Sequence, residues 1–532
     1  MAQTSIIQNI TGGWSVSDIR IANMSDTVNM YVETQGTGSS STSILRSISG
    51  TELFAKLSDR RCRGIFEASR GHDGQPVLFA VFGNKIFVIH DKDNITEIYS
   101  NLTNDDTPVG ICETGGEGSA HPHLIVVDGA NVIAIDTTLS DNDMITDARS
   151  IALPYRVVQD DPEHPSQRIV PTHCAYCYNY LIVNDKDTDA FYISYQYPFE
   201  REGRNHEPVD YDIFMVDPWR EVEVAYKNYG FITYAEWSPD NITAIVSNGT
   251  LLYTFGPKSS QIFNYNSDVD APFTSPSNCA NLIGIKAVNS LAIVGDYVFY
   301  LGSSAIGENG IYFWQGNKLT RCSTPDVERY IQNMEYPEDA VGQVWQENGH
   351  IFYAITFIND DYTLVYDIME NQWHRRSSKD ANTNVFHCWR PMFAILHDSK
   401  IFFGTNDGSI VIMNNNKFTE YDGRTMIRMR RSGALMNNYQ DFIVDGIKLI
   451  CNTGDFNDAN LLPQVMMRYS DNGSYWSNQE IGLLGRQGEY GTECEWFNLG
   501  LHNIMTVEIS CSDPVKFSIV GGKIQYSLVD SF

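Results

Sequence analysis

Short apolar runs broken by turn residues recur through the middle of the sequence. Runs of four to eight β-branched and aromatic residues, bounded by Gly, Asn or Asp, are typical of β-strands. VLFAVF and KIFVI flank Gly83-Asn84 in this way, and a second pair of runs flanks Asn248-Gly249, a dipeptide suited to a type I′ hairpin. The pattern predicts further hairpins within the segments 123–136, 180–195, 291–322, 350–376 and 393–413.

The expected hairpins recur at roughly the length of one propeller blade, which needs about 40–50 residues for four strands and their loops. The turn markers are Gly83, Gly129, Asp185, Gly249, Gly302, Asp360 and Asp407. Their spacings are about 46, 56, 64, 53, 58 and 47 residues. Each small sheet has two apolar faces that it cannot bury alone, and stacking the sheets around an axis buries both. The sequence therefore predicts a β-propeller of six or seven blades.

The two ends of the chain differ from the middle in their pattern of apolar and polar residues. The first 60 residues have few long apolar runs and include QGTGSSSTS, so we expect a mostly irregular arm, anchored at 28–33 and 44–54 and held by other parts of an assembly. The last hundred residues show long alternating strands separated by Asp-Asn-Gly and Gly-Gly turns, which favour a β-sandwich.

The expected fold is therefore all-β, with an N-terminal arm at 1–61, a β-propeller at 62–420 and a C-terminal β-sandwich at 421–532. One helix is expected at 325–334, where Pro325 precedes Val327, Tyr330 and Ile331 on one face.

The chain is strongly acidic. Among its 532 residues, 37 Lys and Arg stand against 66 Asp and Glu, a formal net charge of −29. Such a surface keeps a protein soluble and repels nucleic acid, so it suits either an ordinary acidic protein or a wall past which DNA moves without sticking. Charge alone does not choose between these two. No apolar run approaches the length of a membrane span, and MAQTSIIQNITGG lacks the features of a secretory signal.

Cysteine and histidine offer little chemistry. Ten cysteines without regular spacing indicate free thiols in a reducing compartment. Cys174 and Cys177 form a CxxC, but no second pair of ligands lies at a matching spacing, so neither a zinc site nor a redox role is expected. His121, His123 and His164 lie in Pro- and Gly-rich loops with no recognisable catalytic partners. No cofactor, metal or catalytic residue is expected.

One segment resembles part of a sialidase motif. Asp471-Asn472-Gly473-Ser474-Tyr475-Trp476 matches the D-x-G-x-x-W part of the Asp box, with Tyr469 at the usual Ser or Thr. That box is a structural hairpin in which Asp caps the turn and Trp packs beneath, and here it occurs once, outside the propeller region. We therefore interpret it as a structural hairpin.

Basic residues gather in two places, DRRCRG at 59–64 and the segment with Arg424, Arg428, Arg430 and Arg431. Local salt bridges are one explanation. The other is docking onto an acidic neighbouring subunit, because guanidinium groups pair well with carboxylates. The second cluster is our candidate interface.

Several phrases, in chain order, resemble a family of phage proteins. Val28-Asn29-Met30 is followed by LRSISG at 45–50, which resembles an L-R-S-x-P-G phrase with Ser49 at the usual Pro. Ser69-Arg70-Gly71, a Y-x-S-x-x-Y phrase at 192–197 and the C-terminal RYSDNGSYWS…WFNLGLHNIMTVEISCSDPVKFSIVGG complete the series. Together they resemble the packaged-DNA stabilisation proteins, the tail hub or nozzle proteins of short-tailed bacteriophages.

The resemblance implies a structural virion protein in the phage tail, assembled in the cytoplasm of the host bacterium. It implies a ring of copies of this chain, a hexamer in that family, which extends the portal channel, retains packaged DNA and anchors further tail parts. The implied partners are the portal-adaptor ring and a tail needle, fibre or other tail protein, with DNA passing through the lumen without sequence-specific binding. The family offers no catalytic residues.

Two alternatives remain at the level of sequence, because propellers carry unrelated functions. A propeller glycosidase or sialidase would need convergent Asp, Glu, Arg and Tyr side chains at the central funnel. A propeller adaptor for tail fibres would show exposed aromatic residues at the tops of its blades.

Overall fold

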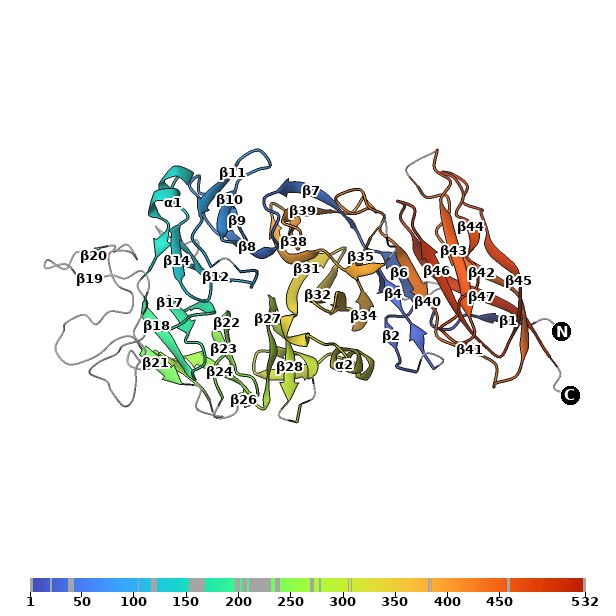
Figure 1. The fold of residues 1–532 in the computed structure, drawn as a ribbon, viewed down its shortest axis with the longest axis horizontal. Coiled ribbons are helices and arrows are strands. Elements are labelled where there is room, and N and C mark those ends of the chain that lie inside the picture. Colours follow the sequence, from blue (N-terminus) through green and yellow to red (C-terminus); the bar gives the residue numbers. More distant parts are fainter. Residues whose placement is uncertain are drawn as a thin grey trace.

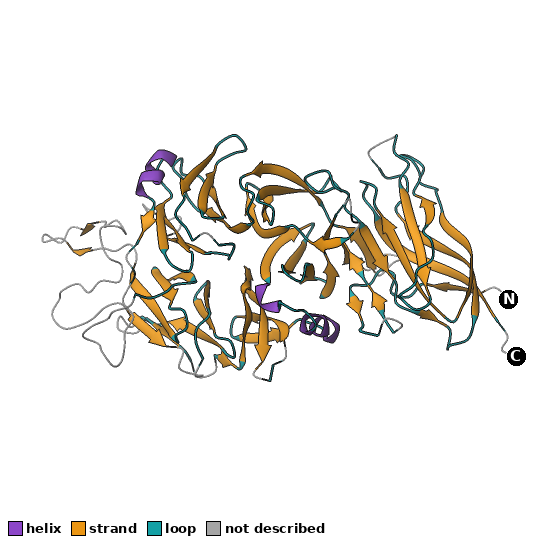
Figure 2. Ribbon diagram, in the orientation of Figure 1, coloured by secondary structure: helices purple, strands orange, loops and turns teal. Residues whose placement is uncertain are grey.

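The computed structural model of the chain describes residues 3–529, apart from 20–21, 37–42, 104, 116–121, 152, 154–167, 197–200, 203–207, 210–230, 235–239, 268–271, 277–278, 305, 308, 381–382, 384 and 457–459. Strands dominate the described residues (Figure 2), and no helix among them is long and apolar enough to cross a membrane. The molecule is elongated, with a propeller at one end and a sandwich, beside which both termini lie, at the other (Figure 1).

Within the described residues, seven antiparallel sheets form the blades. The first two blades are β8 (Cys62–Ala68), β9 (Val77–Phe82), β10 (Lys85–Ile89) and β11 (Ile95–Tyr99), then β12 (Gly110–Thr114), β13 (His123–Val127), β14 (Val132–Asp136) and β15 (Arg149–Ser150). The third blade has β16 (Cys174–Cys177), β17 (Tyr180–Asn184), β18 (Ala190–Gln196) and β21 (Phe231–Tyr234). The fourth has β22 (Ala244–Asn248), β23 (Leu251–Phe255), β24 (Ser260–Tyr265), β25 (Phe273–Thr274) and β26 (Ala280–Asn281).

The last three blades follow the same meander. The fifth is β27 (Ile283–Val294), β28 (Tyr297–Ser304), β29 (Asn309–Gln315) and β30 (Lys318–Arg321), and the sixth is β31 (Val341–Glu347), β32 (His350–Phe357), β33 (Tyr362–Asp367) and β34 (Gln372–Arg375). The seventh has β37 (Pro391–His397), β38 (Lys400–Thr405), β39 (Ser409–Asn414) and, from the start of the chain, β7 (Gly50–Lys56).

The first strands of the blades close a ring. β8, β12, β16, β22, β27, β31 and β37 each contact the next, and β37 contacts β8 again. The seventh blade is completed by β7, which pairs with β39 from Ser409–Lys56 to Asn414–Gly50. A strand from the N-terminal side of the propeller thus closes a blade built from its C-terminal side, which joins the two ends of the ring by a ladder of hydrogen bonds.

Local turn chemistry explains many hairpins. Gly83, between β9 and β10, has φ of 56°, and Gly249, between β22 and β23, has φ of 59°, a region that glycine enters without strain. These two predicted hairpins are confirmed. One turn marker was wrong: Gly302 lies inside β28, where a Cβ atom would lie 2.7 Å from the Tyr312 ring, and the β27–β28 turn contains Gly295 instead.

The expected helix is present as α2 (Pro325–Gln332). Thr324 caps it, because its side chain accepts a hydrogen bond from the Val327 N–H, and Pro325 begins the first turn. Val327 and Ile331 are buried against the fifth and sixth blades. The only other α-helix within the described residues is α1 (Asp141–Asp147), which contacts β11 and β14.

The sandwich has two sheets that face each other across one core. The first is β45 (Cys494–His502), β42 (Phe442–Cys451), β47 (Ser518–Leu528), β6 (Ser43–Ser47) and β5 (Met30–Thr34), with β1 (Gln3–Ile6) also paired to β47. The second is β4 (Thr27–Val28), β40 (Arg428–Arg431), β46 (Ile504–Cys511), β43 (Gln464–Ser470) and β44 (Glu480–Leu483), with β41 (Leu435–Met436) paired to β46.

The second sheet of the sandwich continues into the propeller. β34 of the sixth blade pairs in parallel with β4 at Arg375 and Val28, so one ten-stranded sheet extends from β31 to β44. We call it the bridging sheet. Backbone hydrogen bonds therefore connect the two domains directly.

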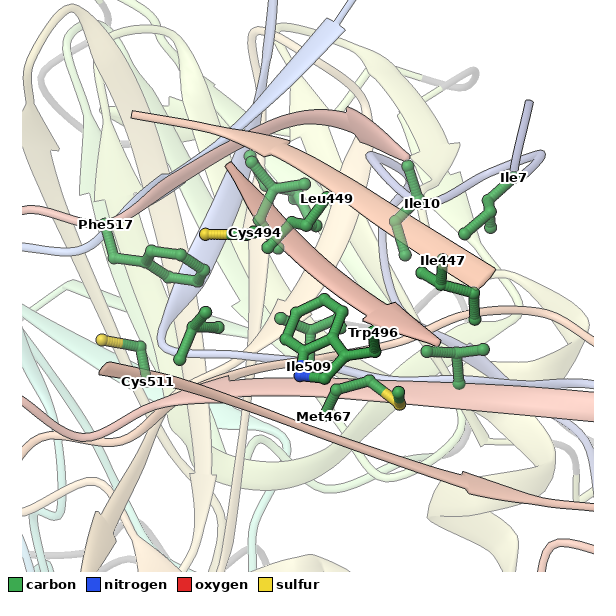
Figure 3. Packing of buried hydrophobic residues seen from close by; sticks show 14 of the residues in the cluster. Ile7, Ile10, Ile447, Leu449, Met467, Cys494, Trp496, Ile509, Cys511 and Phe517 are labelled. Atoms are coloured by element: carbon green, nitrogen blue, oxygen red, sulfur yellow. The ribbon is translucent and has the colours of Figure 1, made fainter. Parts of the chain in front are cut away.

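The sandwich core takes side chains from both of its sheets and from the start of the chain. Trp496 on β45 and Met467 on β43 face each other across it, with Phe517 nearby (Figure 3). Ile7 and Ile10 pack into the same core, and each is only 3% exposed. Burying a side chain of this size contributes about 1.5–3 kcal/mol. Residues 3–10 are therefore part of the sandwich.

The start of the chain is therefore not the mostly irregular arm that its composition suggested. Seven strands, β1 to β7, lie within the described part of residues 3–56, and β2 (Ser15–Val16) and β3 (Met24–Ser25) form a small hairpin. The expected anchors at 28–33 and 44–54 fall in β4 to β7. Of the QGTGSSSTS stretch, residues 37–42 lie outside the described residues.

Candidate functional site

The junction between propeller and sandwich gathers several of the polar residues that the sequence singled out. Asn29 lies at its centre, 1% exposed, with a φ of 55° that asparagine tolerates. Its side-chain amide donates to the carbonyls of Ser377 and Ile427, both at 2.8 Å, and its Oδ1 accepts from the Ser377 N–H at 2.9 Å. The Val28-Asn29-Met30 phrase thus ties the start of the chain to the sixth blade and to the segment that enters the sandwich.

The second phrase, LRSISG, crosses from the sandwich to the propeller. Ser47 donates to the Phe517 carbonyl in the sandwich, and the Ser49 N–H donates to Glu347 Oε1 of β31 at 2.8 Å. Gly50 passes so close to the backbone of Lys417 and Thr419 that a Cβ atom on Gly50 would lie 2.5 Å from the Thr419 carbonyl oxygen. No larger residue fits at this crossing without moving the backbone.

Two of the four candidate interface arginines lie inside this junction. Arg428 and Arg430 are both 0% exposed. Arg430 donates to the carbonyls of Asn9, Ile10 and Gly13 and to the Thr27 hydroxyl. Burial lowers the pKa of Arg430 to about 10. The Arg430 guanidinium holds the N-terminal segment in place, whereas Arg428 donates to the carbonyls of Phe418 and Asp513. Both side chains are buried, so neither reaches the surface to dock on another subunit.

The other two arginines are more accessible. Arg424 is partly exposed and pairs with Asp422 at 2.8 Å. Arg431 pairs with Glu508 at 2.7 Å and lies over the Trp476 ring, 5.2 Å from its centroid. The local salt bridging that the sequence left open accounts for both contacts, and a docking role for Arg424 and Arg431 stays a prediction.

Arg431 lines a cleft of about 670 Å³ between the two domains. α2 and Asp360 form its propeller wall, the N-terminal segment with Asp26 contributes to its floor, and Gly473, Ser474 and Trp476 form its sandwich wall. Four aspartates and three arginines line it, so the charges largely balance: they are Asp18, Asp26, Asp326, Asp360, Arg329, Arg375 and Arg431.

Asp26 is the most constrained of these groups. It is 4% exposed, its Oδ2 lies 3.7 Å from Arg375 Nη1 and 3.8 Å from Arg431 Nη1, and no described residue donates a hydrogen bond to its Oδ1. The cleft therefore has a buried carboxylate between two arginines. Its lining residues offer ion pairing and stacking.

The hairpin that resembles an Asp box is structural, but its details differ from that motif. Asn472 Oδ1 accepts from the Ser474 and Tyr475 N–H groups, both at 2.9 Å, and Ser470 Oγ accepts from Gly473. Asp471 instead bonds His502 at 2.6 Å. The turn is thus held by asparagine and serine.

Trp476, at the end of that turn, stacks with two arginines. Arg431 and Arg468 both lie over its ring, Arg468 at 4.9 Å, and both guanidinium groups pair with the buried carboxylate of Glu508. This stacking fixes one wall of the cleft.

The CxxC on β16 does not converge on a metal. Cys174 packs into the core shared with the second blade, whereas Cys177 packs into the core shared with the fourth blade. Burial lowers the pKa of the adjacent His173 to about 4, which keeps it neutral. Within the described ranges, no three His, Cys, Asp or Glu side chains are placed to hold a metal ion. His123 is buried on β13, and His121 and His164 lie outside the described residues.

Sequence reasoning missed the residues that matter most at the junction. Asp26, Glu347 and Arg376 have no motif around them. Asp26 pairs with Arg375 and Arg431, both more than 300 positions later, and Glu347 bonds both Arg376, 29 positions later, and Ser49, 298 positions earlier. The one local signal was the pair of short phrases containing Asn29 and Gly50, whose residue types suit a left-handed turn and a close backbone approach.

Replacing Arg430 tests its structural role. Arg430→Gln is expected to lower the free energy of unfolding by about 2–3 kcal/mol, because a shorter side chain leaves buried carbonyls of the N-terminal segment without donors. Urea unfolding followed by tryptophan fluorescence measures this. Arg424→Gln is the matched control and should change the value by about 0.5 kcal/mol or less. Equal effects of the two substitutions would contradict the assignment.

Two family models match the chain in the order of its domains. The model described as bacteriophage P22 Gp10, beta-propeller, matches residues 223–417, and the model described as bacteriophage P22 Gp10, beta-sandwich, matches residues 419–527. Together they cover more than half of the chain. No curated protein sequence matches it.

Solved structures resemble the chain only distantly. The extracellular domain of a putative hybrid two-component system from B. thetaiotaomicron is 12% identical with a TM-score of 0.38, over 80% of this chain, and the chain spans only 46% of that domain's length. The WD40 beta-propeller domain of Doa1 is 10% identical with a TM-score of 0.34, over 69% of this chain and 97% of that one. An exo-beta-1,3-galactanase from Phanerochaete chrysosporium is 8% identical with a TM-score of 0.26, over 79% and 95%. TM-scores this low say nothing about function.

Proposed function

Because the chain belongs to the bacteriophage P22 Gp10 family and is therefore a structural protein of a phage tail, we propose that it is a subunit of the tail hub or nozzle. In this role, copies form a closed ring that extends the portal channel, retains the packaged DNA and anchors further tail parts. The protein acts through shape and contact, with no catalytic step.

The observation that carries this proposal is the match of both family models, in order, to a propeller and a sandwich that the bridging sheet joins. A ring subunit under load needs its domains fixed relative to one another. The junction supports that need, because the Asn29 N–H donates to the Arg375 carbonyl of the sixth blade and its side-chain amide donates to the Ile427 carbonyl in the segment leading to the sandwich.

The charge distribution supports a channel through which DNA slides without binding to the wall. The first 420 residues carry −25 of the net charge of −29. Carboxylates repel the phosphates of DNA, whereas Lys and Arg contacts would bind them and slow their passage. We propose that acidic residues of the propeller line part of the lumen.

The proposed partners are further copies of this chain, six in one ring, together with the portal-adaptor ring above it and a tail needle, fibre or other tail protein below it. The proposed location is the tail of the virion, after assembly in the cytoplasm of the host bacterium.

Electron cryomicroscopy of the phage particle tests the ring. The expected result is density for the propeller and sandwich, repeated around the tail axis below the portal. Particles assembled without this protein are expected to lose their packaged DNA, which nuclease sensitivity of the genome would report. Density off the tail axis, or full particles that keep their DNA without the protein, would contradict the proposal.

A further inference from the structure

Exposed apolar side chains are concentrated in the sandwich. Of the 25 large hydrophobic residues that are exposed within the described part of the chain, 12 occur from Met436 onward. That segment is less than a fifth of the sequence. Soluble monomers scatter such residues, and a concentration of them marks a surface that another molecule covers. The sandwich is therefore the domain that offers a contact surface.

Five of these side chains lie along one edge of the sandwich. Ile443 on β42 and Leu501 on β45 are opposite each other in the ladder, and Phe497 on β45 lies against Gly446 on the same outer face. Val444, Trp496 and Leu499 point the other way, into the core. β44, which contacts β45, adds Ile481 and Leu483. We call Ile443, Ile481, Leu483, Phe497 and Leu501 the edge patch.

The opposite edge of the same sheet bears a groove of about 600 Å³. It is formed by β1, by residues 22–25 and by residues 433–437, together with Phe442, Ile524 and Tyr526. No residue that lines it is charged, although charged residues make up 19% of the chain. Polar uncharged groups such as Gln8, Asn9 and Asn23 surround apolar ones such as Leu435 and Met436. We call it the uncharged groove.

The patch and the groove lie on opposite sides of the central strands. β47 pairs with β42 on one side and with β1 on the other, so the local order is β45, β42, β47, β1. A surface on one edge that fits a surface on the other edge gives head-to-tail contacts between identical subunits. Such contacts generate rings or filaments.

Electrostatics favours a second copy as the occupant. Two copies with a charge of −29 repel each other wherever their acidic surfaces meet. Residues 421–532 contain 9 basic and 13 acidic residues, so they carry only −4 of that charge. Two copies therefore repel each other least when their sandwiches meet. Neither the edge patch nor the uncharged groove contains a charged residue that would add to the repulsion.

From these observations we propose that the edge patch of one copy packs into the uncharged groove of the next, sandwich against sandwich, around the ring. This inference rests on the proposed function, which calls for a ring, and it identifies the surfaces that close it.

Matched aspartate substitutions test the proposal on the full-length protein. Phe497→Asp places a negative charge in the edge patch, and Met436→Asp places one in the uncharged groove. Leu396→Asp places the same charge at an exposed leucine of the seventh blade. We expect light scattering after size exclusion to show a ring for the wild type and for Leu396→Asp. The patch and groove variants are expected to have the 60.0 kDa mass of one chain. All three sites are exposed, so their thermal unfolding midpoints should stay at the wild-type value.

Mixing the two defective variants tests the head-to-tail geometry. The Phe497→Asp chain keeps its groove and the Met436→Asp chain keeps its patch, so an equimolar mixture should form dimers that grow no further. A ring formed by Phe497→Asp alone, a mixture that stays monomeric, or a wild-type chain that is monomeric at its highest soluble concentration would overturn this inference. The particle image decides the proposed function separately, because a ring closed through other surfaces would still appear there.

Discussion

A chain that lacks residues 1–56 is expected to accumulate as insoluble, unfolded protein, whereas the full chain is expected in the soluble fraction. The deletion removes β7, so β39 keeps its ladder with β38 but loses its partner on the other edge, and the seventh blade is left incomplete. It also removes β4 from the middle of the bridging sheet and takes Met30 and Leu45, each 0% exposed, out of the sandwich core. Each such loss costs about 2–5 kcal/mol, and a whole domain is stable by only about 5–15 kcal/mol.

Expression and sedimentation of the truncated chain measure this outcome. The matched control deletes residues 1–6 only, which removes β1, a four-residue strand whose residues are exposed. That control should stay soluble and lose little stability. A truncated chain that remained soluble and unfolded cooperatively on heating would show that the propeller closes without its N-terminal strand.

Glu347→Ala is expected to lower the free energy of unfolding by about 3–5 kcal/mol. Glu347 pairs with Arg376 at 2.7 Å, and both side chains are 0% exposed. The Arg376 guanidinium lies over the rings of Trp345, Phe352 and Trp389, so it has no route to water once its carboxylate is gone. Removing Glu347 therefore leaves a buried charge without compensation, and it also removes the acceptor of the Ser49 N–H.

The pH dependence of stability gives a second measurement of this pair. Burial alone would raise the pKa of Glu347, but the Arg376 guanidinium and the Ser49 hydrogen bonds hold it below its usual value. A lowered pKa means that the stabilisation is complete above the unfolded-state value of about 4.3 and is lost as the pH falls through the folded-state value. Glu347→Gln should therefore show a weaker loss of stability in acid than the wild type.

An exposed ion pair provides the control. Lys85 and Glu97 pair at 2.6 Å on the surface of the first blade, and Glu97→Ala should change the free energy of unfolding by about 0.5 kcal/mol or less. Urea unfolding of both variants makes the comparison. Similar losses for Glu97→Ala and Glu347→Ala would show that burial does not strengthen the Arg376 pair.

The hairpins could be predicted because their information is local. A glycine with positive φ between two apolar runs specifies a turn within a few residues, as at Gly83 and Gly249. α2 was equally accessible, since Thr324, Pro325 and the buried Val327 lie within one turn of helix. Gly302 was wrongly predicted as a turn because the sequence does not distinguish a turn glycine from a strand glycine. Inside its strand, the Tyr312 ring leaves no room for a side chain at this position.

The N-terminal strands could not be predicted because their partners are remote. β4 has only two residues and is defined by β34 and β40, about 350 and 400 positions later. No alternation is visible in two residues. The arginine cluster was interpreted as a candidate interface for the same reason. The acceptors of Arg430 are backbone carbonyls near residue 10, and a backbone carbonyl cannot be recognised from the residue type. The resemblance to a phage family was visible because it rests on short local phrases. In two of these phrases, Asn29 and Gly50 occupy positions where the backbone geometry restricts the residue type.

The position of β7 also sets the order in which the protein can fold during translation. A ribosome releases residues 50–56 first, yet their partner β39 ends at residue 414, and the β47 residues that pair with β6 come only near residue 519. The nascent chain cannot complete either domain until its final strands have emerged, in contrast to proteins that fold one domain at a time. A product that ends before residue 409 therefore lacks β39 and cannot close its propeller, and one that ends before residue 518 lacks the β47 residues that pair with β6.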